Sequence, residues 1–370
     1  MKLCELLSGV GVVKTNANLE MEISSVAYDS RKVTPGCLFV AVTGFATDGN
    51  KYIPMALEKG AVAVITAKEQ DPSVPYVQVE SDRLALALIS SNYFGNPAAS
   101  MQMIGVTGTN GKTSSTLLLK HVLQTVLDAK VGLIGTMENM IGHTSIPTER
   151  TTPESYELQA LLAQMRDAGC THVIMEVSSH AIALERVGGM HFAVAAFTNL
   201  TEDHLDFHKT MDAYCDAKAL LMGRCDHAVV NGDDAYAPRM LAAVSSDAIT
   251  TGVHGDADLK AEELELLSDK IRFLAVHSGE KTVVELPIPG RFTVYNALTV
   301  LAVAKCLGIP VAESAAALRT ATGVKGRIEV VPTPGTDYTV LIDYAHTPDG
   351  LENVLRSVRD FCKGRTLPFC

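Results

Sequence analysis

Short apolar runs alternate along the chain with segments in which apolar residues recur at helical spacing. Over the first hundred residues, the runs predict strands at 37–42, 61–66 and 76–79, and the periodic segments predict helices near 53–59 and 82–93. Asn96-Pro97 follows the second helix and is typical of a boundary. We therefore predict a small α/β domain that covers residues 1–98.

The alternation continues through the middle of the chain with longer helices. Apolar runs predict strands at 101–106, 130–134, 172–177, 193–197 and 227–231, and short strands with polar turns occupy 249–289. Helices are predicted at 114–127, 211–222, 297–307 and 311–320. Another helix is expected to start with Thr152 as its cap and Pro153 at its first position. Strands that alternate with helices indicate a parallel, doubly wound sheet, so we predict a central domain at residues 99–326.

A glycine-rich turn joins the first central strand to its helix, and it consists of Gly108, Thr109, Asn110, Gly111, Lys112 and Thr113. Backbone N–H groups of such a turn bind phosphate, a lysine here reaches the outer phosphates, and a threonine hydroxyl binds Mg²⁺. The strict pattern has glycine at position 106, where this chain has Val106. Gly-Lys-Thr in a strand–turn–helix context therefore carries the prediction of a P-loop ATPase-like central domain.

Two further groups of polar residues follow predicted strands. Glu176 lies at the carboxyl end of its strand, where doubly wound sheets bind ligands, and is either an Mg²⁺ ligand or a turn residue. Lys218 lies on a later helix. It either takes part in the chemistry of the polar residues at 202–208 or only forms an ion pair with one of their carboxylates. Two histidines among three carboxylates are typical of metal or phosphate chemistry. That second group consists of Glu202, Asp203, His204, Asp206 and His208.

The first domain carries two polar loops, at residues 28–36 and 44–52. Asp29-Ser30-Arg31 in the first loop places small hydrogen-bonding groups beside a cation, which suits a nucleotide or another polar anion. The same residue types are also common in turns that bind nothing. The loop alone therefore leaves both explanations open.

Composition excludes several classes of protein. The chain has 370 residues and a net charge of −11, which disfavours a general nucleic-acid binder because such proteins need clustered Lys and Arg. Its eight cysteines form no Cys-x-x-Cys pair, and we expect them to be reduced core residues. The N-terminus lacks a signal-peptide pattern, and no apolar segment reaches membrane-spanning length. We predict a cytoplasmic protein with no membrane partner.

Together these motifs resemble the Mur ligases, the ATP-dependent enzymes that form amide bonds in peptidoglycan precursors. The similarity extends from about Ser24 to about Gly364. The matching segments are 108–113, 176–180, 199–208, 217–218, 290–296, 326–327 and 343–348. The branch that adds the third amino acid to UDP-N-acetylmuramoyl-dipeptide is indicated by residues 29–31, 151–154, 178–180 and 343–346.

The resemblance implies a role for each matching residue. ATP would be held by Gly108, Thr109, Asn110, Gly111, Lys112, Thr113, Asn296, Arg327 and Asp343. Mg²⁺ would be held by Thr113, Glu176, His204 and Lys218, the last as a carbamate formed with CO₂; Lys112, Lys218 and His204 would be catalytic. The UDP-linked substrate would be held by Ser30, Thr151, Thr152, Ser178 and Arg186. Leu184 replaces a glutamine that is common in the family, which removes one expected polar contact.

The implied reaction has two steps and uses ATP and Mg²⁺ as cofactors. The D-glutamyl carboxylate attacks the γ-phosphate of ATP and forms an acyl phosphate, and the amine of a free amino acid then displaces phosphate. Because phosphoryl transfer depends mainly on charge neutralisation, Lys112 and Mg²⁺ suit the first step. The family leads us to expect meso-diaminopimelate, rather than L-lysine, as the amino acid, and a monomeric enzyme.

The C-terminal segment predicts a third domain that is incomplete. Residues 327–370 contain one strand and a helix at 351–362 and would begin a Rossmann-like ligase domain, but Pro368 would interrupt the strand that follows in the family. An isolated strand–helix pair buries too little surface to fold alone. We therefore predict a C-terminally truncated chain that is weak or inactive as a ligase, which full turnover in a phosphate-release assay would contradict.

Three alternatives stay open. Another Mur-type ligase, such as the D-Ala-D-Ala-adding or the polyglutamate-forming type, is disfavoured by residues 151–152 and 178–180. The UDP-muramoyl peptide that raises the melting temperature would identify the type. A non-catalytic nucleotide-binding remnant would bind ATP without turnover. A generic P-loop kinase would leave residues 199–208 and Lys218 without a role.

Overall fold

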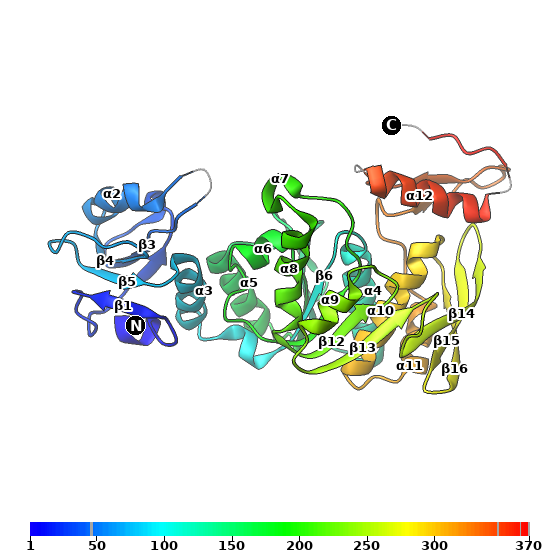
Figure 1. Cartoon of the computed structure of the whole chain (residues 1–370), viewed down its shortest axis with the longest axis horizontal. Helices are drawn as coiled ribbons and strands as arrows, with labels where there is room; N and C mark the ends of the chain where they lie inside the picture. The colour runs from blue at the N-terminus through cyan, green and yellow to red at the C-terminus, as the bar shows by residue number, and fades with distance from the viewer. Residues whose placement is uncertain (45–46, 346–347, 363, 369–370) are drawn as a thin grey trace. The chain divides into compact units, whose positions relative to one another are not determined.

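A computed structural model describes residues 1–44, 47–345, 348–362 and 364–368 of the chain (Figure 1). The chain forms two compact units, each assembled from three segments. Unit 1 consists of residues 1–101, 152–169 and 180–190, and unit 2 of residues 102–151, 170–179 and 191–370. Both units contain helices and strands, which confirms the prediction of an α/β protein. The predicted domain boundaries at residues 98 and 326 stay predictions.

Unit 1 contains a five-stranded sheet with strand order β1-β5-β4-β3-β2. Its strands are β1 Val12–Thr15, β2 Ser25–Ala27, β3 Cys37–Val40, β4 Ala61–Thr66 and β5 Tyr76–Val79. β1 is antiparallel to β5, and the other neighbours are parallel. The helices are α1 Leu3–Leu6, α2 Ile53–Glu58, α3 Asp82–Tyr93 and α5 Ser155–Asp167, with 3-10 turns at Ser30–Lys32, Gly49–Tyr52 and Pro97–Ser100. The apolar pattern does not predict β1 and β2, because β1 is largely exposed and β2 has three residues.

Helices cover both faces of the unit 1 sheet, which explains why β3 is apolar throughout. Leu38 packs on one face in a buried cluster with Leu86 and Ile89 of α3. Phe39 points to the opposite face and packs with Ile53 of α2. Burial of side chains of this size contributes about 1.5–3 kcal/mol each to the free energy of unfolding.

Unit 2 contains an eleven-stranded sheet with strand order β16-β15-β14-β13-β12-β11-β6-β10-β7-β8-β9. Neighbours from β7 through β6 to β14 are parallel, and antiparallel hairpins extend the sheet at both ends. The strands are β6 Gln102–Thr107, β7 Val131–Ile134, β8 Asn139–Ile141, β9 Thr144–Ile146, β10 His172–Glu176, β11 Phe192–Phe197, β12 Cys225–Asn231, β13 Asp247–Gly252, β14 Leu259–Leu266, β15 Ile271–His277 and β16 Glu280–Leu286.

β6 lies among the parallel strands of unit 2, between β11 and β10. The chain that leaves β6 leads to β7 on one side, whereas the chain that leaves β10 crosses to β11 on the other side. Doubly wound sheets bind ligands at such a reversal, outside the carboxyl ends of the strands. The topology therefore points to the turn that follows β6.

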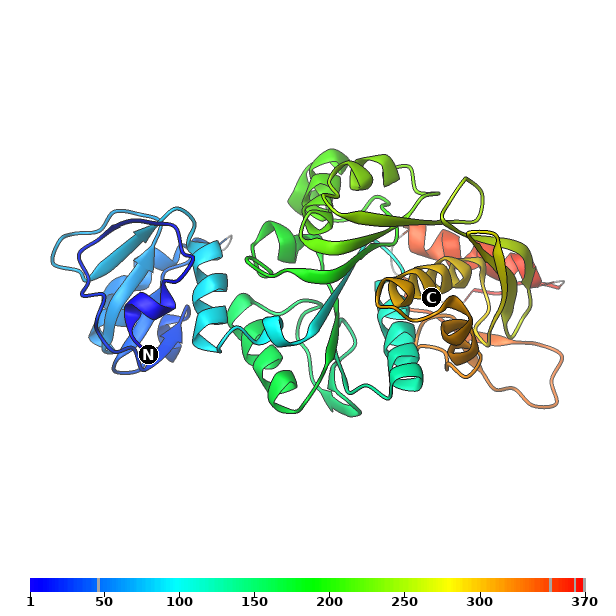
Figure 2. The same ribbon diagram turned by 90° about the horizontal axis from the view of Figure 1, so that it is seen from below.

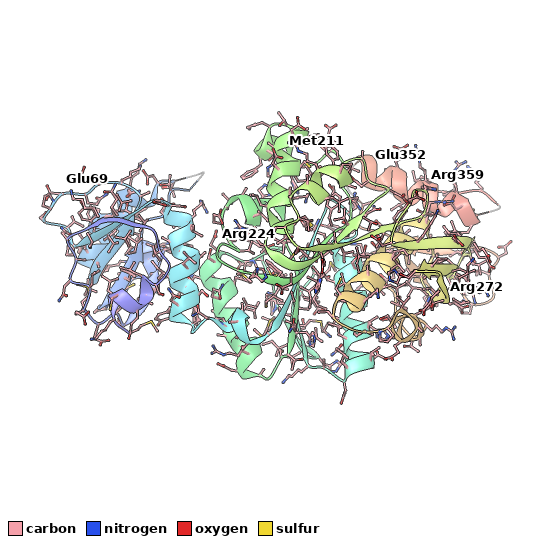
Figure 3. All side chains as sticks on the ribbon, turned by 60° about the horizontal axis from the view of Figure 1, so that its bottom comes forward. Glu69, Met211, Arg224, Arg272, Glu352 and Arg359 are labelled. Atoms are coloured by element: carbon pink, nitrogen blue, oxygen red, sulfur yellow. The ribbon has the colours of Figure 1, made fainter. Side chains whose placement is uncertain are left out.

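Helices lie on both faces of the parallel strands of unit 2 (Figure 2). α4 Lys112–Leu127, α10 Arg291–Cys306 and α11 Val311–Leu318 pack together on one face, with alternate strand residues such as Ile104 and Val194 in one buried cluster. α8 Met211–Met222, whose first residue is labelled in Figure 3, contacts β6, β11 and β12. The remaining short helices of unit 2 are α7 Leu205–His208 and α9 Ala237–Ala242, whereas α6 Ser179–Ala183 begins with Ser179 in unit 2 and continues through residues 180–183 of unit 1.

Four helices begin at residues other than those predicted: α4 begins at Lys112 rather than at residue 114, the last helix begins at Pro348 rather than at residue 351, and α5 and α10 also differ. α5 begins at Ser155 with Glu154 as its cap, so the prediction of Thr152 as cap and Pro153 at the first position is wrong. The Glu154 carboxylate accepts a hydrogen bond from the Ser155 N–H. α10 begins at Arg291 rather than at residue 297, because its polar first turns are buried and the Thr293 hydroxyl donates to the Pro289 carbonyl at 2.8 Å.

Two segments contain strands that the apolar pattern does not predict. The polar stretch after β7 holds the β8–β9 hairpin. Near the C-terminus, β17 Glu329–Val331 and β18 Val340–Ile342 pair as a hairpin where one strand is predicted, and α12 Pro348–Phe361 follows. Residues 364–368 form no strand. His346 and Thr347 lie outside the described residues, and the assignment of this segment to a Rossmann-like domain stays a prediction.

The cysteines differ in their surroundings. Cys37, Cys170, Cys215 and Cys225 are buried thiols, as predicted, but Cys4 is exposed and Cys306 and Cys362 are half-buried, so the prediction of core positions is wrong for these three. Burial raises the pKa of the Cys170 and Cys225 thiols and keeps them protonated. Cys370 lies outside the described residues. Within the described part of the chain, no helix has the length and apolar character that a membrane span requires.

Candidate active site

The predicted phosphate loop lies between the end of β6 at Thr107 and the start of α4 at Lys112. Gly108 and Gly111 both have positive φ, at +148° and +85°, which favours glycine. A Cβ atom on Gly108 would lie 1.9 Å from Thr198 Oγ1, and one on Gly111 would lie 2.6 Å from Asn296 Oδ1. The structure thus confirms the strand–turn–helix context and places the loop against the segment after β11 and against α10.

Asn199 clamps the phosphate loop through its side chain and its backbone. Its amide accepts from the Asn110 N–H at 2.8 Å and donates to the Asn110 carbonyl at 3.0 Å. Its own carbonyl accepts from the Thr109 N–H at 2.8 Å, and the Thr198 hydroxyl donates to Asn110 at 2.7 Å. The sequence places Asn199 in a matched segment but assigns it no role, because its contact with the loop exists only in the fold.

We expect Asn199→Ala to weaken phosphate binding about tenfold and to lower the free energy of unfolding by about 1–3 kcal/mol, because the Asn110 N–H and carbonyl each lose a hydrogen bond to the Asn199 amide, although the carbonyl keeps the one from the Thr198 hydroxyl. Nucleotide titration and denaturant unfolding measure the two effects. Asn16→Ala is a matched control in unit 1, since the Asn16 amide also bonds backbone on both sides, to Val74 and Tyr76. If Asn16→Ala weakened nucleotide binding as much as Asn199→Ala, the proposed role of Asn199 in holding the phosphate loop would be wrong.

Two lysines meet at one carbonyl of the loop. Lys112 Nζ donates to the carbonyls of Gly108 and Thr109 at 2.8 Å each, and Lys218 Nζ, on α8, donates to the same Gly108 oxygen at 2.9 Å. Lys218 is 1% exposed. Burial lowers the pKa of both amines, and for Lys218 the neighbouring charge of Lys112 lowers it further. The site therefore favours a neutral amine at Lys218.

Glu176, the last residue of β10, is 1% exposed and lies at the first turn of α4. Its Oε1 accepts from the Thr113 hydroxyl and from the Thr136 N–H, and its Oε2 accepts from the Thr136 hydroxyl, each at 3.0 Å. A Cβ on Gly135 would lie 2.6 Å from Oε1, so the carboxylate fits tightly. A hydroxyl and a carboxylate oxygen in direct contact are ligand types that Mg²⁺ prefers, so these two residues fit the predicted metal.

In the polar segment at 202–208, which follows β11, the structure brings His204 close to Asp203. His204 has φ +53°, and its Nε2 lies 3.4 Å from Asp203 Oδ2. Burial lowers the pKa of His204, and Asp203 opposes that effect. Among the residues that the structure describes, no three His, Cys, Asp or Glu side chains are placed to hold a metal ion. The role of His204 as a metal ligand stays a prediction.

Tyr214 lies between Lys218 and the two histidines of the polar segment, and the sequence assigns it no role. Its hydroxyl lies 3.2 Å from Thr109 Oγ1, and Lys218 Nζ lies 4.6 Å from the centre of its ring. The ring also lies 5.0 Å from that of His208, whose Nε2 is 2.9 Å from Ser179 Oγ. Burial raises the pKa of Tyr214 to about 12, so its hydroxyl stays protonated.

The three other predicted ATP contacts lie in unit 2. Asn296 is 6% exposed and accepts from the Ser115 hydroxyl at 3.4 Å. The Arg327 guanidinium lies 5.5 Å from the centre of the Tyr344 ring. Asp343 accepts from two backbone N–H groups, those of residues 328 and 345, at 2.8 Å each, so its observed contacts stabilise a turn. The ATP contacts of these residues stay predictions.

The predicted substrate-binding residues fall in both units. In unit 1, Arg186 donates to the Thr152 carbonyl at 3.1 Å and pairs with Glu154 at 3.3 Å, whereas Ser30 lies 3.6 Å from a methionine sulfur. In unit 2, the Thr151 and Thr136 hydroxyls lie 3.0 Å apart, and Ser178 follows the strand that carries Glu176. Within unit 1 the structure brings Arg186 and Thr152 together, and within unit 2 it brings Thr151 close to the Glu176 cluster.

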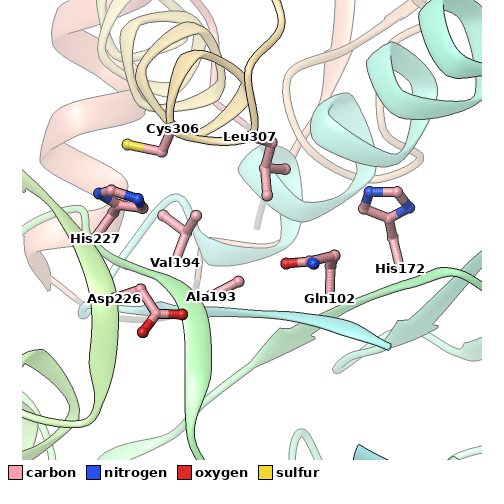
Figure 4. Close-up of a pocket in the computed structure, with 8 residues that line it drawn as sticks. All are labelled: Gln102, His172, Ala193, Val194, Asp226, His227, Cys306 and Leu307. Atoms are coloured by element: carbon pink, nitrogen blue, oxygen red, sulfur yellow. The ribbon is translucent and has the colours of Figure 1, made fainter. Parts of the chain in front are cut away.

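A cavity of about 460 Å³ lies at the opposite edge of the unit 2 sheet, at the amino ends of its strands (Figure 4). It is lined by Gln102, His172, Ala193, Val194, Asp226, His227, Cys306 and Leu307. Burial lowers the pKa of His172 and raises that of Cys306 to about 11. The cavity contains no predicted site residue, and six strand residues, about 20 Å, separate its edge from the phosphate loop.

Two family models match the chain: the Mur ligase middle domain, over residues 106–304, and the Mur ligase family catalytic domain, over residues 22–93. The first matches more than half of the chain. Together they span most of the segments in which the motifs lie.

Named relatives are similar over nearly the whole chain. The UDP-N-acetylmuramoyl-L-alanyl-D-glutamate--2,6-diaminopimelate ligase of Clostridium botulinum is 44% identical over 94% of this chain and 73% of its own length. That of Caldanaerobacter subterraneus subsp. tengcongensis is 45% identical over 99% of this chain and 76% of its own length. A solved structure of a UDP-N-acetylmuramoyl-L-alanyl-D-glutamate--2,6-diaminopimelate ligase has 27% identity and a TM-score of 0.84 over 98% of this chain and 74% of that one. MurF from Acinetobacter baumannii, at 21% identity and a TM-score of 0.66 over 97% of this chain and 76% of its own, shares the fold.

Proposed function

This chain belongs to the Mur ligase family of ATP-dependent amide ligases, and on that premise we propose that it adds an amino acid to UDP-N-acetylmuramoyl-L-alanyl-D-glutamate in peptidoglycan precursor synthesis. The observation that carries the proposal is the contact of Thr113, at the phosphate loop, with the buried Glu176 carboxylate, beside two lysines on one loop carbonyl. The names of the relatives support 2,6-diaminopimelate as the added amino acid, and we propose its meso form. We propose a monomeric, cytoplasmic enzyme.

The phosphate loop binds the nucleotide through backbone donors at the start of α4. The N–H groups of residues 111–113 and the positive end of the helix dipole attract the phosphates. Lys112 leaves the carbonyls of Gly108 and Thr109 and moves its charge to the outer phosphate. Thr113 and Glu176 would hold Mg²⁺, which neutralises phosphate charge when bound.

Lys218 contributes as a carbamate in this proposal. Its neutral amine attacks CO₂, the N–C bond forms, and a proton leaves to water, which gives an anion in place of a neutral group beside Lys112. The lowered pKa of Lys218 favours the amine form that can react. The resulting anion attracts the neighbouring Lys112 ammonium at the Gly108 carbonyl, whereas the neutral amine does not. His204 is the further proposed ligand on this side.

The acceptor is activated at its D-glutamyl carboxylate. We assign its binding to Ser30, Thr151, Thr152, Ser178 and Arg186, of which Arg186 and Thr152 are already in contact. The carboxylate oxygen attacks the γ-phosphate, ADP leaves, and the acyl phosphate then reacts with the amine of the amino acid. Displaced phosphate is the second product.

A phosphate-release assay with product detection by mass tests the proposal. We expect turnover with ATP, Mg²⁺, UDP-N-acetylmuramoyl-dipeptide and meso-diaminopimelate, and at least about tenfold lower kcat/KM with L-lysine. Turnover with a UDP-muramoyl-tripeptide and D-Ala-D-Ala instead would identify another ligase type. ATP binding without any turnover would contradict the ligase and favour a nucleotide-binding role.

A further inference from the structure

The hydroxyl of Thr136 contacts two groups from distant segments of unit 2. It lies 3.0 Å from Glu176 Oε2 and 3.0 Å from Thr151 Oγ1. The Thr136 N–H donates to the other Glu176 oxygen, also at 3.0 Å. One exposed residue after β7 therefore links the carboxylate assigned to the metal with a hydroxyl assigned to the acceptor.

Hydrogen counting gives this chain of contacts a direction. A threonine hydroxyl has one hydrogen and two lone pairs, and an ionised carboxylate can only accept. The Thr136 hydrogen is therefore directed at Glu176, and the Thr136 oxygen accepts from the Thr151 hydroxyl. On the other side, the Thr113 hydroxyl donates to the same carboxylate. The order is Thr151 to Thr136 to Glu176, with Thr113 opposite.

We propose that Thr136 is a positioning residue that couples acceptor binding at Thr151 to nucleotide and metal binding at Glu176 and Thr113. The inference rests on the proposed function for the identity of both ligands. Because the hydrogen of Thr151 points to Thr136, Thr151 faces its ligand with lone pairs. The acceptor group at this position is therefore an N–H or O–H donor rather than a carboxylate or phosphate oxygen.

Coupling follows from the shared hydrogen bonds. A donor on the Thr151 oxygen polarises the chain and strengthens the bond from Thr136 to Glu176. That bond and the one from the Thr136 N–H hold the two carboxylate oxygens in place at the first turn of α4, so less ordering remains when the metal and nucleotide bind. By linkage, the nucleotide tightens acceptor binding by the same factor.

Calorimetric titration of the full chain with a non-hydrolysable ATP analogue and Mg²⁺, with and without UDP-N-acetylmuramoyl-dipeptide, measures this coupling. We expect the dipeptide to tighten nucleotide binding at least about fivefold in the wild type and less than about twofold in Thr136→Val. Thr136→Ser keeps the hydroxyl and should keep the coupling. Thr144→Val, an exposed threonine in β9, is the matched control and should also keep it.

Different outcomes would overturn the inference about Thr136 and the proposed function on which it rests. Equal coupling in Thr136→Val and the wild type, or no coupling in a wild type that binds both ligands, would overturn the inference alone. A wild type that binds neither ligand would overturn the proposed function. Loss of coupling in both Thr136→Val and Thr136→Ser, at unchanged melting temperature, would show that the hydroxyl is not the group responsible and would also overturn the inference.

Discussion

Lys218→Ala is expected to lower ligase turnover by about 10³-fold while nucleotide binding remains measurable. The buried amine lies 2.9 Å from the Gly108 carbonyl, and its lowered pKa favours the neutral form that combines with CO₂. Alanine removes both the amine and the carbamate that it forms. Phosphate release measures the loss, and depletion of bicarbonate should lower the rate of the wild type but not that of the variant.

Lys120→Ala provides the control for burial alone. Lys120 is also a buried lysine with a pKa lowered by burial, but its Nζ bonds to Gln124 one turn along α4. We expect this variant to keep its bicarbonate response and its turnover within about threefold. Equal losses of turnover in both variants would contradict a chemical role for Lys218.

The same pKa shift predicts how stability depends on pH. In the window between the lowered pKa of folded Lys218 and the ordinary value near 10.4, the unfolded chain binds a proton that the folded protein does not. The free energy of unfolding therefore gains a contribution that rises with pH through this window and is absent in Lys218→Ala. Denaturant unfolding at several pH values compares the two proteins.

Gly108→Ala is expected to lower the free energy of unfolding by about 3 kcal/mol or more and to abolish measurable nucleotide binding. A side chain at φ +148° is strained, and its Cβ would lie 1.9 Å from Thr198 Oγ1 and 3.1 Å from the Asn199 backbone. Relief of that overlap moves the segment that clamps the phosphate loop. Denaturant unfolding and nucleotide titration measure the two losses.

Two comparisons separate the energetic cost of the atomic overlap at Gly108 from the cost of its backbone strain. Gly308 also has positive φ, +83°, but a Cβ there would meet nothing within 4 Å, so Gly308→Ala should cost only about 1 kcal/mol and leave nucleotide binding intact. Thr198→Ala in the Gly108→Ala background removes the nearest atom and should recover part of the stability. Equal costs at Gly108 and Gly308 would show that the close approach has no energetic effect.

Elements with a clear apolar period could be predicted from the sequence. β4, β5, α3 and α8 have the predicted bounds, because turn residues or caps interrupt the pattern at their ends. The β8–β9 hairpin and the first turns of α10 could not be predicted, because their residues are polar and their hydrogen bonds form only in the folded chain. The cap of α5 shows the same limit, since Thr152 suits that position by type but its carbonyl is engaged by Arg186.

Some residues of the candidate site could be predicted from the sequence and others could not. Gly108, Lys112, Glu176 and Lys218 have residue types and positions after strands that indicate their chemistry, and the structure brings them together. Asn199, Tyr214 and Thr136 have ordinary types, and their importance depends on partners about 40 to 105 residues away. A single sequence carries no signal for such pairs.

The three-segment composition of each unit has a consequence for gene exchange between relatives. The backbone passes between units after residues 101, 151, 169, 179 and 190, so no single stretch of codons encodes a whole unit. If recombination replaced only the first 101 codons with those of a relative, α3 would come from the relative. Residues 180–190 of the same unit would still come from the original gene. Leu84 and Leu88 of α3 reach to 2.9 Å and 2.4 Å from the Cβ positions of Gly188 and Gly189, so a side chain at either glycine requires the facing leucine to shift. The three segments of unit 1 are therefore expected to be inherited together.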